Sequence, residues 1–160
     1  MRLRTATWLF SCLLLAHPAL AQDSGDNAAI TAKLESAGVK FEIDGDGDFK
    51  SVYNYEDEGR TQLVFVSGKV NELEGIVVRE VFSPAANVPD GGFTSAQALK
   101  LLADSQDKIL GAWEVSGSTL LFVVKLPDNA DGKAFETAMD VAAAAADDME
   151  IVLTNGADEY

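Results

Sequence analysis

Apolar residues recur along this chain with two different periods, which predict its helices and strands. A period of three to four residues is typical of an amphipathic helix, and strict alternation is typical of a half-buried strand. We therefore expect helices over 27–37, from 94 towards 108 and over 131–153. We expect strands over 39–43, 49–55, 63–66, 76–82, 109–115 and 119–126.

Glycine, proline and capping residues mark the ends of these segments. Thr94 and Gln97 form a capping-box pattern, and Gly38 is placed to stop the first helix. The segment 84–92 holds two prolines and a glycine pair, so we expect a long loop there. Further polar connections are expected at 45–47, 57–60, 68–75, 116–118, 127–132 and 155–156.

The spacing also predicts which side chains face the core. In the helices, the expected inward-facing residues are Ile30, Leu34, Ala37, Ala98, Leu99, Leu102, Ile109, Phe135, Met139, Ala142, Ala146, Met149 and Leu153. Residues 63–66 are apolar on both faces, which places their strand at the centre of the sheet. Meandering strands with helices between the strand groups predict an α+β fold, with an antiparallel β-sheet flanked by helices in the order α-β-β-β-β-α-β-β-α.

The first 21 residues have the layout of a secretory signal peptide. Two arginines precede an apolar stretch at 8–16, and a small-residue cleavage site ends at Ala21. The stretch is too short to span a bilayer, so we expect cleavage after Ala21 and a periplasmic or secreted bacterial protein. We expect a flexible leader over 22–27 and a single domain over 28–156.

Cleavage removes the only cysteine, Cys12, and the only histidine, His17. A lipid anchor on Cys12 is the weaker alternative to cleavage, because this residue lies inside the apolar stretch rather than after it. Without both side chains, the remaining chain has no Cys or His nucleophile–base pair, usual zinc site, disulfide or haem ligand.

The remaining chain is strongly acidic. It keeps 10 basic and 26 acidic side chains, which give a net charge of −16. This charge repels phosphate backbones and anionic lipid, so we expect neither nucleic acid nor a membrane surface as partner. Basic proteins, cationic peptides or divalent cations suit it better, and the simpler alternative is that the acidity only maintains solubility.

Three short segments and the element order resemble one known family. The segments are Asp44-Gly45-Asp46-Gly47-Asp48-Phe49, Leu126-Pro127 and Ala145-Ala146-Asp147-Asp148-Met149-Glu150. Together they are similar to the YbjN family of bacterial sensory transduction regulators, over roughly Ala28 to Leu153. The resemblance implies a type III secretion chaperone-like fold, a domain that binds protein as a homodimer, and no catalytic residues. The chaperone-like relatives work in the cytoplasm, whereas the export signal argues against a cytoplasmic chaperone role here.

Asp44, Asp46 and Asp48 form the sharpest candidate for a metal site. Alternating carboxylates resemble the start of a calcium-binding loop. An EF-hand, however, needs glycine at loop position six and glutamate at position twelve, and these positions hold Phe49 and Tyr55. We therefore favour a glycine-rich hairpin turn in which the aspartates cap backbone amides, and we expect no cofactor.

Other constellations point only weakly to catalysis. Two carboxylates at a suitable separation could act as a glycosidase pair, but no sequence feature selects one pair among many. The segment Ser67-Gly68-Lys69 lacks the spacing of an S-x-x-K site and is expected to form a polar turn. We therefore expect no enzyme, with a carboxylate-based hydrolase as the least favoured alternative.

Two features bear on partner binding. Trp113 lies on an alternating strand, where a core position is favoured over an exposed partner anchor. The five alanines at 142–146 suit either close packing on the sheet or a dimerisation helix. The sequence thus predicts an exported, non-enzymatic protein-binding or regulatory module that forms a homodimer. The main alternative is a sensor domain that responds to calcium or a small ligand.

Overall fold

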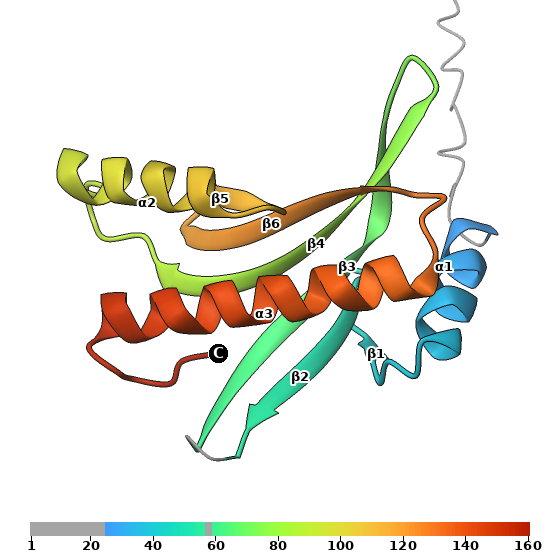
Figure 1. Ribbon diagram of the computed structural model, residues 1–160, viewed down its shortest axis with the longest axis horizontal. Helices are drawn as coiled ribbons and strands as arrows, with labels where there is room; N and C mark the ends of the chain where they lie inside the picture. Colours follow the sequence, from blue (N-terminus) through green and yellow to red (C-terminus); the bar gives the residue numbers. More distant parts are fainter. Residues whose placement is uncertain (1–24, 57–58) are drawn as a thin grey trace, which may run out of the picture.

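The computed structural model describes residues 25–56 and 59–160, so the predicted signal peptide and the first part of the predicted leader lie outside the described residues. The helices are α1 (Gly25–Ser36), α2 (Ser95–Asp107) and α3 (Gly132–Thr154). The strands are β1 (Glu42–Ile43), β2 (Phe49–Tyr55), β3 (Arg60–Leu73), β4 (Ile76–Asn87), β5 (Ala112–Ser116) and β6 (Thr119–Pro127). They form one antiparallel sheet in the order β1-β2-β3-β4-β6-β5 (Figure 1). The predicted α+β class and element order are confirmed.

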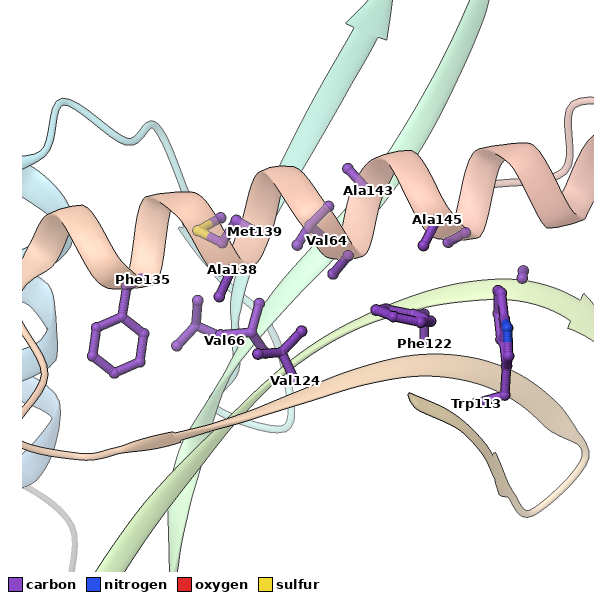
Figure 2. Packing of buried hydrophobic residues seen from close by; sticks show 14 of the residues in the cluster. Val64, Val66, Trp113, Phe122, Val124, Phe135, Ala138, Met139, Ala143 and Ala145 are labelled. Atoms are coloured by element: carbon purple, nitrogen blue, oxygen red, sulfur yellow. The ribbon is translucent and has the colours of Figure 1, made fainter. Parts of the chain in front are cut away.

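The core lies between α3 and one face of the sheet. Phe135, Met139, Ala142 and Ala146 are fully buried, as the helical period of the sequence predicts. Figure 2 shows this side of α3 facing the strands, with the Phe135 ring pointing from the helix to the level of Val66. Asp131 caps the helix by accepting a hydrogen bond from a backbone N–H of its first turn.

The first helix packs on α3 through two of the three residues predicted for it, whereas Ala37 follows the end of the helix at Ser36 and is half-buried. Ile30 and Leu34 are buried, and Gly38 adopts a φ of 77° that ends the helical path. The helix begins at Gly25, so the last part of the predicted flexible leader is helical instead. None of the helices within 25–56 and 59–160 has the length and apolar character needed to cross a membrane.

The predicted connection over 68–75 is wrong, because β3 continues to Leu73. The register of β3 against β4 shifts between Val66 and Val70, which marks a β-bulge. Gly68 lies in this bulge, where a Cβ would stand 2.1 Å from the carbonyl oxygen of Gly47. The glycine therefore permits a close backbone approach instead of marking a turn.

Other strand boundaries also differ from the prediction, and the third and fifth strands begin at Arg60 and Ala112 instead of 63 and 109. The fourth strand continues through Pro84 to Asn87, and a second register irregularity beside Pro84 accommodates its missing N–H. The first strand keeps only Glu42 and Ile43, and Ile43 is 57% exposed. The alternating apolar residues before Glu42 pack on the core but do not pair as a strand.

The inward face predicted for α2 is wrong. The predicted capping box at Thr94 is present, yet Leu99, Leu102 and Ile109 are 66%, 64% and 100% exposed. Only Leu101 of this helix is buried. The helix lies along β5, at the end of the sheet, and a helix that contacts a single strand buries only a narrow stripe (Figure 1).

Candidate interaction surfaces

The sheet has one face covered by helices and one face that is not. On β3, Gln62, Val64 and Val66 are fully buried under the helices. Side chains alternate along a strand, so Leu63 and Phe65 point to the opposite face. Neither belongs to the cluster of residues that packs around α3 within the described chain.

Apolar side chains of four strands continue this uncovered face. Phe65 and Phe82 stand opposite each other on β3 and β4, and their rings stack with centroids 5.1 Å apart and an interplanar angle of 8°. Phe82 is also opposite Val123 on β6. We call this set the apolar band, which consists of Val52, Leu63, Phe65, Phe82, Leu121 and Val123.

A single lysine beside the apolar band compensates one of two neighbouring carboxylates. Lys125 on β6 donates to Glu114 at 2.7 Å and lies 3.6 Å from Glu80. The pKa of Lys125 is raised by its hydrogen bond to Glu114 and by the charges of both carboxylates, against a smaller opposing effect of burial. This part of the rim of the band therefore keeps one negative charge in excess.

A buried ionic cluster joins β3 to α3. Arg60 donates from Nε to Asp147 at 2.8 Å and from Nη2 to Glu150 at 2.6 Å. The Glu150 side chain is fully buried, and this burial raises its pKa more than the Glu159 backbone N–H and Arg60 lower it. Such a cluster holds the two elements in one fixed position.

The C-terminal residues fold back onto this cluster. Arg60 Nη1 donates to the carbonyl oxygens of Gly156 and Ala157, and the backbone N–H of Glu159 donates to Glu150 at 2.8 Å. Asn155, with a φ of 57°, reverses the chain after α3. Figure 1 shows the C-terminus returning along α3, so the tail completes the hydrogen bonding of buried charges.

A hollow of about 280 Å³ lies at the β2 end of the sheet. It is lined by Gly38, Val39, Lys40, Ser51, Val52, Tyr53, Glu136 and Asp140. The hydroxyl of Tyr53 donates to Asp140 at 2.9 Å. Burial, the hydrogen bond and the nearby carboxylates raise the pKa of Tyr53, so the phenol stays protonated as a donor.

The aspartates of the first hairpin are engaged with backbone amides. An oxygen of Asp44 accepts from the N–H groups of Asp46 and Asp48, and Asp48 accepts from the N–H of Gly68. This is the arrangement of a capped turn. Among the described residues, no group of three or more metal-ligating side chains is gathered at this turn or elsewhere.

The remaining candidate residues lie in the core or in strands. Trp113 is 9% exposed, packs edge-to-face on Phe122 and donates from its indole N–H to Asp104 (Figure 2). Four of the five alanines at 142–146 are buried in the core, with Ala144 outside it. Ser67 belongs to the β3 bulge, where its hydroxyl accepts from the N–H of Lys69.

Sequence reasoning missed the ionic cluster, the tail and the hollow. Asp147 and Glu150 are three residues apart on α3, which puts both on one side of the helix. Two acidic residues next to the buried face of α3 indicate that a basic side chain packs against the helix there. The spacing alone does not identify this side chain as Arg60. Comparison of the chain with models of known protein families and with curated proteins finds no match.

Proposed function

We propose that this chain is an exported, non-enzymatic protein-binding module, related to the YbjN family, that works as a homodimer. The observation that carries the proposal is the apolar band on the uncovered face of the sheet. Val52 of this band is exposed, Val123 is buried and the other members are half-buried, and an apolar sheet face that no helix covers is typical of an interaction site.

A second copy of the chain is the occupant proposed for the apolar band. The whole chain has a formal net charge of −14, so two copies repel each other over most of their surfaces. At the rim of the band, Lys125 is paired with both Glu80 and Glu114 and compensates one of these two carboxylates. This pairing reduces the repulsion between two such faces.

Equilibrium sedimentation of the processed chain tests the dimer. We expect a dimer that becomes monomeric with Phe82→Lys, because the substitution places a charge at the centre of the band. Leu99→Lys is the matched control, since Leu99 is an exposed leucine of α2 away from the band. A monomeric wild type, or a dimer that Phe82→Lys leaves intact, would show that the band has another role.

Cross-linking in intact cells, followed by mass spectrometry, tests the protein-binding role. We expect a recurrent envelope protein to cross-link to the tagged full-length chain. The recovery of self-cross-links alone would contradict the adaptor role and leave only the dimer.

A further inference from the structure

The two ends of the sheet are protected differently. At the β5 end, α2 lies along the strand, and Ser105 of this helix accepts the backbone N–H of Trp113. At the opposite end, β1 has two residues and pairs with β2 only at Phe49 and Lys50. Most of β2 is thus an edge of the sheet with no strand beside it in the described chain.

The backbone groups at this edge can be identified from the hydrogen-bond pattern. The N–H of Asp44 donates to the carbonyl oxygen of Asp48, so Asp48 turns its backbone groups towards the β1 side. Backbone groups of an antiparallel strand point to the same neighbour at every second residue. Val52 and Asn54 therefore present their N–H and C=O groups to the open edge, and both side chains are exposed.

The chain before β1 leaves the edge instead of covering it. The carbonyl oxygen of Lys40 accepts from the hydroxyl of Ser51, whose side chain is buried on the helix-covered face. The chain at Lys40 therefore stands above the sheet, and the hollow lies between it, β2 and α3. The hollow therefore lies beside the backbone groups that Val52 and Asn54 present to the open edge.

The charges of the hollow favour a cationic side chain. Glu136 is bound to Lys133 at 2.8 Å, and the Lys40 side chain is exposed. Asp140, which accepts from Tyr53, is thus the carboxylate most available to a ligand. An arginine placed over the Tyr53 ring could donate to Asp140 and stack on the ring. The net charge of −14 attracts such a ligand at longer range.

We infer that the β2 edge binds an extended peptide segment as an added antiparallel strand, with an arginine or lysine of that segment in the hollow beside Tyr53 and Asp140. The inference rests on the proposed protein-binding function and names the site of the partner. Backbone groups of the segment pair with Val52 and Asn54, which supplies affinity, and the residue opposite Tyr53 supplies selectivity.

A designed peptide tests the inference. The probe is a fluorescein-labelled, end-capped Thr-Val-Arg-Val-Thr peptide, in which the arginine stands opposite Tyr53 and the valines stand opposite Val52 and Asn54. Fluorescence anisotropy measures binding to the full processed chain, and amide hydrogen exchange locates it. We expect binding that weakens with salt, and slower exchange at Val52 and Asn54.

Matched variants separate the two parts of the site. Val52→Pro removes an edge N–H without touching the β3 ladder, and we expect it to weaken binding about tenfold, while Val52→Thr retains binding. Asp140→Asn is expected to weaken binding by a similar factor, whereas Asp148→Asn, a change at another exposed acid of α3, leaves it unchanged. A peptide with glutamate in place of arginine should not bind.

Several results would overturn the inference. These are no binding of the arginine peptide, equal binding of the glutamate peptide, equal binding by Val52→Pro, or slowed exchange elsewhere in the chain. Val52 belongs to both the apolar band and this edge, but the dimer measurement uses Phe82→Lys on β4, two strands away from the edge. Peptide failure with an intact dimer and a cross-linked partner therefore overturns the strand-edge inference alone, whereas a monomer without a partner overturns the proposed function.

Discussion

Arg60 on β3 and Glu150 on α3 form an ion pair of 2.6 Å in which the carboxylate is fully buried. The two residues are 90 positions apart in the chain, so the pair exists only when the last helix has docked on the sheet. Asp147 completes the cluster on the same helix.

Replacing Arg60 with methionine should strongly destabilise the fold. The substitution keeps an unbranched, flexible stem but leaves two buried carboxylates without their cation, at a cost of about 3–5 kcal/mol. Urea unfolding measures the free energy of unfolding, and Lys133→Met, which breaks an exposed pair, is the control. We expect the loss to be larger at alkaline pH, because protonation can neutralise Glu150 at acidic pH. An unchanged midpoint of unfolding would contradict this role.

The pH dependence of stability should carry a component from Glu150. Its folded pKa is raised above the ordinary value of 4.5 by burial, so the folded chain holds this proton more tightly than the unfolded chain. The resulting stabilisation is complete below pH 4.5 and is lost as pH rises through the folded pKa. The difference in unfolding free energy between wild type and Glu150→Gln should therefore fall with rising pH. A difference that rises instead would mean that Arg60 outweighs burial.

Removal of the tail after Gly156 should lower the free energy of unfolding by about 1–3 kcal/mol. It takes away the backbone N–H of Glu159, which donates to Glu150, and the carbonyl oxygen of Ala157, which accepts from Arg60. Thermal unfolding of the truncated chain measures the effect. Glu159→Ala keeps the backbone N–H and should behave like wild type. Equal melting temperatures for all three chains would show that water replaces the tail without cost.

Gly68→Ala should destabilise the β3 bulge. The added Cβ would lie 2.1 Å from a backbone oxygen of Gly47, and backbone atoms cannot move aside as a flexible side chain can. A loss of about 1–3 kcal/mol is expected from such overpacking. Gly45→Ala is the control, because a Cβ there meets nothing within 4 Å. Similar unfolding curves for the two variants would remove the steric argument.

Local pattern predicted the parts of the fold that one element determines by itself. The stripe of α3 through Phe135 and Met139 follows from helical spacing, and the capping box at Thr94 follows from residues three positions apart. The inward face of α2 could not be predicted, because it depends on the helix lying at the end of the sheet, where Leu101 alone is buried.

The bulge and the candidate sites depend on contacts between distant segments. Ser67-Gly68-Lys69 has the composition of a turn, and only the approach of Gly47 reveals why the glycine is needed. Arg60 is polar and is the last residue of the turn predicted at 57–60, so nothing local indicates its burial under α3. The edge of β2 is open because the chain leaves the sheet at Lys40. The alternation of apolar and polar residues does not predict this path.

The contrast between the two ends of the sheet limits how the protein can assemble. Because α2 lies along β5 and accepts the backbone N–H of Trp113, the β2 end is the more open edge for a contact between copies. Two copies joined through their β2 ends would leave only the β5 ends, which α2 lines, for a third. Growth into a fibre by strand pairing is therefore disfavoured after a single step, and the domain can accept a strand at β2 with little tendency to become a template for aggregation.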